Sequence, residues 1–138
     1  MRIGALLLPA IALLAQTAGA AAAEQRPAFS GVSAIRIANY GAPSVLLDGR
    51  AKVAPIVSEL NALAKGPWRR GETKLSCYST IVLLKGAKPV GQLRVTAEHV
   101  VERPVEKGQS SYSLAIGETD LSSLRAALAE ILPAKGCD

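Results

Sequence analysis

The sequence predicts a small α+β domain in which two amphipathic helices pack on an antiparallel sheet of four or five strands. The chain has 138 residues, of which 49% are hydrophobic and 20% charged, and this balance fits one folded domain with a core. Several segments of alternating polarity are joined by short turns, as in antiparallel strand pairs. Two other segments have the apolar spacing of helices, which need a sheet to cover. The expected element order is β-(β)-α-β-β-β-α.

The first 23 residues have the layout of a secretory signal peptide. Arg2 supplies the positive start, residues 3–14 are apolar, and mostly small residues follow up to Ala23. The alternative is a membrane anchor, but a spanning helix needs about 20 strongly apolar residues, and this run ends before that length. We therefore expect cleavage after Ala20 or Ala23. The mature protein would be periplasmic or secreted, about 115 residues long, with no stable membrane insertion.

Residues 24–31 are expected to form an irregular lead-in, and a single α+β domain then spans residues 32–138. Val32–Tyr40 is predicted to be a strand because its apolar and polar residues alternate. The short apolar piece Ser44–Leu47 can form a second strand before the Asp48-Gly49 turn.

The first helix is expected to start near residues 52–54 and to end at Gly66-Pro67. Pro55 is predicted to lie in the first turn, where its missing N–H costs nothing. The apolar residues follow helical spacing: Val53, Ile56, Val57, Leu60, Leu63 and Ala64.

Three further strands are predicted at Lys74–Leu84, Val90–Val101 and Ser111–Ile116, the first two joined by a hairpin turn. The run Ile81–Leu84 is apolar on both faces. It indicates either an inner strand covered on both sides or an open sheet face used for dimerisation.

The last helix is expected after a cap at Thr119 or Asp120 and before Pro133 and Gly136. Its predicted apolar stripe consists of Leu121, Leu124, Leu128, Ile131 and Leu132.

The two cysteines, Cys77 and Cys137, are predicted to form a disulfide. An even pair in an exported protein is more often bridged than free. No Cys-x-x-Cys pair indicates a redox site.

Common catalytic and cofactor signatures are absent from the sequence. There is no Gly-x-Ser-x-Gly, and one histidine excludes His-Glu-x-x-His. The run Gly66 to Thr73 has phosphate-loop spacing, but Glu72 replaces the lysine that faces the phosphates. No cofactor or metal is therefore expected. His99 is assigned to the apolar face of its strand, and an unrecognised catalytic site around it is the alternative.

The strongest candidate for a contact surface is the loop at residues 65–74, with Trp68, Arg69, Arg70 and Lys74 as its binding residues. Trp and Arg are enriched at binding hot spots. The alternative is that Trp68 packs over the C-terminus of the first helix while the basic residues complement the helix dipole.

These observations predict a small exported, non-enzymatic binding or interaction module of the cell envelope. Its partner would be a protein, a glycan or an anionic envelope component, and a dimer is compatible with the pattern. Few aromatic residues and the exported location argue against nucleic acid. The alternatives are a small extracytoplasmic enzyme with a site near His99, or an inhibitor of an extracytoplasmic enzyme.

Overall fold

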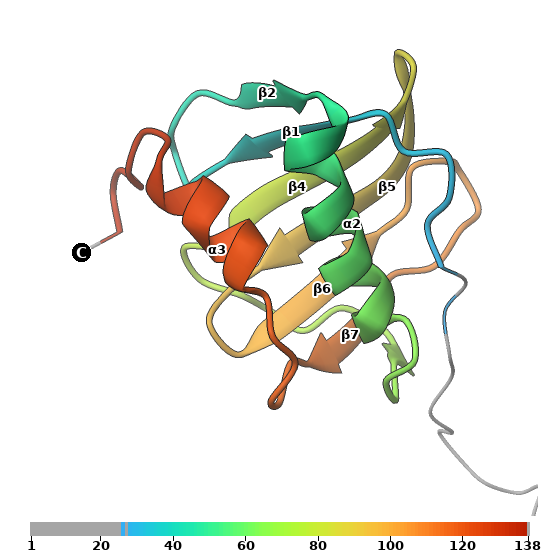
Figure 1. Ribbon diagram of the computed structural model, residues 1–138. Coiled ribbons are helices and arrows are strands. Elements are labelled where there is room, and N and C mark those ends of the chain that lie inside the picture. Colours follow the sequence, from blue (N-terminus) through green and yellow to red (C-terminus); the bar gives the residue numbers. More distant parts are fainter. Residues whose placement is uncertain (1–25, 27, 138) are drawn as a thin grey trace, which may run out of the picture.

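The computed structural model describes residue 26 and residues 28–137, which form an α+β fold (Figure 1). The predicted signal peptide lies outside these described residues. Within them, two helices accompany a seven-stranded sheet. The elements are β1 (Ala34–Ala38), β2 (Val45–Asp48), α2 (Arg50–Leu63), β3 (Arg69–Arg70), β4 (Ser79–Lys85), β5 (Lys88–Val95), β6 (His99–Arg103), β7 (Tyr112–Ala115) and α3 (Ser122–Ala129).

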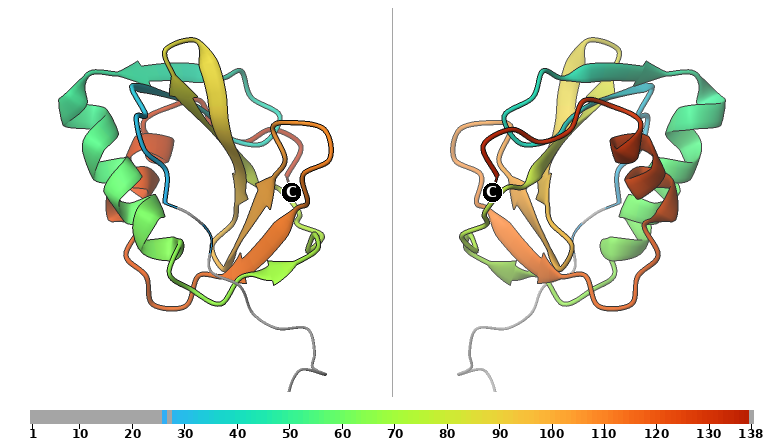
Figure 2. Two further views of the ribbon diagram at one scale, coloured as in Figure 1. Left: turned by 90° about the vertical axis from the view of Figure 1, so that its right-hand side faces the viewer. Right: turned by 90° about the vertical axis from the view of Figure 1, so that its left-hand side faces the viewer.

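The strands follow the order β2-β1-β4-β5-β6-β7-β3, and every neighbouring pair is antiparallel. Both helices lie on one face of the strongly curved sheet (Figure 2). The core fills the space between them, so alternate strand residues point into it. Its fully buried members include Ile35, Ile37, Ile56, Leu60, Ile81, Leu83, Leu93 and Leu124.

The α+β class is confirmed, but the predicted number of four or five strands is wrong. One additional strand is β3, which spans two residues and pairs with β7 at the sheet edge. Another arises because the predicted strand Val90–Val101 is broken into β5 and β6. At the break the Thr96 hydroxyl accepts hydrogen bonds from the backbone N–H groups of Glu98 and His99. This local bonding turns the chain back on itself.

Helix α2 begins earlier than predicted, and Pro55 does not lie in its first turn. The chain enters the helix from Gly49, whose φ of 93° suits glycine. The Gly49 carbonyl accepts hydrogen bonds from the N–H groups of Lys52 and Val53. Pro55 therefore falls in the second turn, where it is exposed. The carbonyl that would otherwise accept from that N–H belongs to Ala51, which is also an exposed residue.

Helix α3 is capped differently from the prediction. Asp120 accepts a hydrogen bond from the Ser122 N–H, but the next two amides bond to a residue of the other helix. The Glu59 carboxylate accepts from Ser123 N at 2.7 Å and from Leu124 N at 2.9 Å. The helix ends at Ala129, so the predicted stripe member Leu132 lies beyond it and is 52% exposed.

Strand β4 lies between β1 and β5, so Ile81–Leu84 belong to an inner strand of the sheet. Ile81 and Leu83 lie in the core, whereas Val82 on the other face is partly exposed, so the predicted covering of both faces is incomplete there. The strand starts at Ser79 rather than at Lys74, because the chain before it turns at Cys77, whose φ is 51°. The predicted disulfide is also confirmed: Cys77 and Cys137 are bonded, with their Cα atoms 5.7 Å apart. It joins the loop before β4 to the C-terminal segment.

Candidate binding surface

Trp68 is not the exposed contact residue that the binding hypothesis requires. Its side chain is 3% exposed and belongs to the hydrophobic core. The indole N–H donates a hydrogen bond to the carbonyl of Leu63 at 2.8 Å. Two backbone hydrogen bonds turn the chain so that Trp68 folds back toward α2. The Gly66 N–H donates to the Leu63 carbonyl, and the Trp68 N–H donates to the Gly66 carbonyl. The alternative interpretation, a tryptophan packed at the helix C-terminus, is confirmed.

The two arginines that follow Trp68 are exposed on β3. Their register places Arg69 opposite Ser113 and Arg70 opposite Tyr112. Lys74 is exposed in the loop after β3. Because β3 pairs with β7, Arg70 lies next to Tyr112, which is distant in the sequence. Arg70 is exposed there, whereas Trp68 is buried.

Tyr112 is contacted by guanidinium groups from two segments. The Arg70 guanidinium donates a hydrogen bond to its hydroxyl at 3.3 Å. The Arg26 guanidinium carbon lies 3.8 Å from the centre of the ring, which is a favourable cation–π distance. Arg26 Nε also donates to Glu102 at 2.9 Å. Sequence reasoning missed Arg26, because it lies in the lead-in and its partner Glu102 is 76 positions away.

A second arginine cluster holds Glu72 near this site. Arg103 donates hydrogen bonds to both carboxylate oxygens at 2.6 Å, and Arg94 donates to one of them at 3.2 Å. The hydrogen bond from Arg103, together with the positive charges of Arg103 and Arg94 and a hydrogen bond from Ser111, lowers the pKa of Glu72 despite the opposing effect of burial. Glu72 is therefore an ionised partner for arginines of two neighbouring strands.

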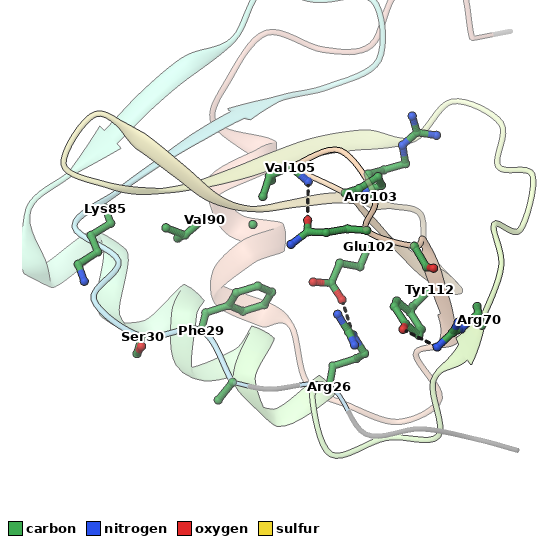
Figure 3. A pocket seen from close by; sticks show the side chains of 16 residues that line it. Arg26, Phe29, Ser30, Arg70, Lys85, Val90, Glu102, Arg103, Val105 and Tyr112 are labelled. Atoms are coloured by element: carbon green, nitrogen blue, oxygen red, sulfur yellow. Dashed lines mark hydrogen bonds and ion pairs between the residues drawn. The ribbon is translucent and has the colours of Figure 1, made fainter.

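A pocket of about 670 Å³ opens beside Tyr112 (Figure 3). Among the described residues that line it, four are basic and one, Glu102, is acidic; the basic ones are Arg26, Arg70, Lys85 and Arg103. We refer to this cavity as the arginine pocket. Its walls come from the lead-in, β3, the β4–β5 hairpin, β6, β7 and the loop between β6 and β7, so only the tertiary structure assembles it.

His99 lies on the opposite face from the one predicted. Val100 belongs to the core, so the neighbouring His99 points to the other side of the sheet. The prediction failed because the turn at residues 96–98 resets the alternation. His99 lines a separate pocket of about 600 Å³ together with Glu72, Arg69 and other residues. A general base works best with a pKa near the operating pH, whereas the arginines lower the pKa of Glu72. In this pocket the arginines therefore favour the ionised form of Glu72.

No protein-family model, curated protein or solved structure matches the chain. Within the described residues, no three His, Cys, Asp or Glu side chains are grouped so that they could hold a metal ion. The helices in that same part of the chain are too short or too polar to cross a membrane.

Proposed function

We propose that this protein is an exported, non-enzymatic binding module of the cell envelope that holds an anionic group of its partner in the arginine pocket. One observation carries the proposal: among the described residues, four basic side chains line a pocket of about 670 Å³, two of them with carboxylate partners, Arg26 with Glu102 and Arg103 with Glu72. Without Arg2 of the predicted signal peptide, fifteen basic and eleven acidic side chains give a formal charge of +4. This excess favours encounter with an anionic partner.

The contacts within the pocket support a binding role. Guanidinium groups match the planar geometry of carboxylates and phosphates and can donate two parallel hydrogen bonds to them. Arg26 is held by Glu102 and by the ring of Tyr112, while Arg70 is held by the hydroxyl of Tyr112. Side chains that are held in place before binding lose less entropy when the ligand arrives.

The proposed site retains part of the surface suggested by the sequence. Arg70 belongs to the arginine pocket, whereas Arg69 lines the separate pocket with His99 and Lys74 is exposed in the loop after β3. Trp68 is excluded because it is buried. An inhibitor that binds an acidic surface of an extracytoplasmic enzyme would be a special case of the same function.

The proposal is tested by titrating the mature protein, residues 24–138, with three anionic probes: inorganic phosphate, polyglutamate and hexagalacturonate. We expect saturable binding of at least one probe, which weakens as salt screens the charges. Arg70→Gln should lower the affinity about tenfold, which corresponds to about 1.4 kcal/mol.

Arg36→Gln is the matched control, because Arg36 is an exposed arginine on β1 that does not line the pocket. Its affinity should stay within about twofold of the parent protein. The proposal is wrong if none of the probes binds, or if the two variants weaken binding equally.

A further inference from the structure

The arginine pocket has basic side chains at both ends, and both apolar side chains and an ion pair lie between them (Figure 3). Lys85 lies at one end, where β4 enters the hairpin, and Arg70 lies at the other end, on β3. Phe29 and Val90 lie between these two charges on the side of Lys85, and the paired Arg26 and Glu102 lie between Phe29 and Arg70. We call this cavity the trough, because Lys85 and Arg70 lie at its opposite ends instead of forming one cluster of positive charge.

The apolar floor of the trough is built in advance of any ligand. Gly91 allows the Phe29 ring to approach the backbone of β5, since an added Cβ there would lie 2.6 Å from Phe29 Cε1. The Phe29 backbone is fixed to α2 by two hydrogen bonds with Asn61: its N–H donates at 2.7 Å, and its carbonyl accepts at 3.0 Å. A ligand therefore meets a fixed apolar surface between the two cationic ends.

This combination favours a peptide over a polysaccharide. An acidic polysaccharide would bring hydroxyl groups against Phe29 and Val90, and burying hydroxyls without hydrogen bonds is unfavourable. An apolar peptide side chain would instead gain free energy by leaving water at that place. Tyr112 offers no open ring to a sugar, because it is 7% exposed and lies against the Arg26 guanidinium.

We infer that the arginine pocket binds an extended acidic peptide segment of a protein partner, with carboxylates facing the two cationic ends and an apolar side chain on the floor. This inference rests on the proposed function, because it names the partner class for the same pocket. In an extended peptide, alternate side chains point the same way and are about 6.6 Å apart. A segment with the pattern acidic-x-apolar-x-acidic therefore presents an apolar side chain between two carboxylates on one side, in the same order as the groups along the trough.

The test uses a fluorescein-labelled peptide with the sequence Glu-Ser-Leu-Ser-Glu, blocked at both ends, and follows its anisotropy with the mature protein. We expect saturable binding with a Kd of about 0.1–1 mM, as is usual for so few contacts. Replacing both Glu by Gln should abolish binding, and replacing Leu by Ser should weaken it at least fivefold. Hexagalacturonate should compete only weakly.

Protein variants then examine each part of the trough. Lys85→Gln and Arg70→Gln, one at each end, should each weaken peptide binding about fivefold to tenfold. Val90→Asp should weaken it more than tenfold by placing a charge on the floor. Arg36→Gln serves as the control and should change the affinity by less than twofold. Thermal unfolding of each variant verifies that the fold is retained.

The outcomes separate the two proposals. If Arg70→Gln weakens binding of the anionic probes while Lys85→Gln and Val90→Asp leave peptide binding unchanged, the trough inference is wrong and the anion-binding function stands. Tighter binding of hexagalacturonate than of the peptide also overturns the inference in favour of a glycan. If neither the peptide nor any anionic probe binds, both proposals fail.

Discussion

Trp68 and Arg70 lie two positions apart in the chain but belong to different parts of the molecule. The indole of Trp68 is part of the core and bonds to the last residue of α2. Arg70 is exposed and contacts Tyr112. A short segment therefore both closes the end of a helix and supplies a side chain to the arginine pocket.

We expect Trp68→Ala to destabilise the protein by about 3–5 kcal/mol, as for other buried large aromatic residues. Trp68→Phe should cost less, because it keeps most of the apolar contact while losing the hydrogen bond to Leu63. Urea unfolding measures both changes, with the exposed Lys74→Gln as a control that stays within about 0.5 kcal/mol. Red-shifted tryptophan emission that iodide quenches easily would contradict the buried position.

Glu72 should make the stability of the protein depend on acid pH. Its hydrogen bonds and ion pairs with Arg103 and Arg94 hold its pKa below the ordinary value of 4.5. Its contribution is therefore fully present above about pH 4.5 and is lost as the pH falls through the lowered pKa of the folded state. Glu72→Gln should lower the melting temperature at pH 7, and the difference should shrink as the pH approaches 3.

The control for this titration is Glu130→Gln, a substitution of an exposed carboxylate after α3. Melting curves of both variants between pH 3 and 7 provide the comparison. If the melting temperature of Glu72→Gln differs from that of the parent protein by the same amount at every pH in this range, the carboxylate charge does not stabilise the fold.

At the scale of elements, α3 depends on the rest of the molecule at both of its ends. It has eight residues, and an isolated helix of that length is unstable in water. Glu59 of α2 binds its first amides. The Asn39 amide donates to the carbonyls of Leu128 and Leu132 at 2.9 and 3.0 Å. Glu59 and, at the Leu128 carbonyl, Asn39 satisfy backbone groups that a helix leaves unpaired at its ends, and the bond to Leu132 holds the segment after the helix.

Glu59→Ala should therefore lower the free energy of unfolding by about 0.5–2 kcal/mol, as expected for removal of a helix cap. The amides of Ser123 and Leu124 should exchange with deuterium faster in this variant than in the parent protein. Glu118→Ala, which removes an exposed carboxylate just before α3, is the control. Equal effects of the two substitutions would contradict the capping role.

At the scale of the whole molecule, the C-terminal segment is attached to the loop before β4 and to the end of β1. The disulfide Cys77–Cys137 makes the first connection. The Lys135 N–H makes the second by donating to the carbonyl of Tyr40 at 2.7 Å. Tyr40 also meets Tyr78 edge to face, with ring centres 5.5 Å apart. The disulfide closes the part of the chain between the two cysteines into a loop, and the contacts of Tyr40 join that loop to the segment after β1.

The purified protein should have no free thiols when it is denatured, and its reduction should lower the melting temperature. A native disulfide in a small exported domain contributes about 2–5 kcal/mol, mainly by restricting the unfolded chain in the entropy model. For a domain of this size, that loss corresponds to a fall of at least several degrees. Two thiols titrated in protein taken directly from its native compartment would contradict the bridge.

The predicted export and signal-peptide cleavage are tested on the full-length protein expressed in its own cells. Mass spectrometry of the envelope fraction should find an N-terminus at Ala21 or Glu24, because small residues precede both positions. Membrane-bound protein that still begins at Met1 would contradict the predicted cleavage and location.

Features of the fold that depend on neighbouring residues could be predicted from the sequence. Apolar alternation predicted the strand containing Tyr112, Leu114 and Ile116, all of which are buried. The hairpin between β4 and β5 was predicted from its turn residues, and residue pairing there places Lys85 opposite Lys88. Apolar spacing likewise predicted both helices, because an element that buries one face repeats its pattern within a few positions.

The arginine pocket could not be predicted from the sequence, because its residues come together through long-range contacts. Arg26 meets Glu102 across 76 positions, and Arg70 meets Tyr112 across 42. The two-residue strand β3 is too short to produce a periodic signal, and it is defined by its pairing with β7. Periodicity reports which side of an element is apolar, but it does not report which elements become neighbours. The charges of the pocket come together because long-range strand pairing and the path of the lead-in over α2 bring distant residues to the same place.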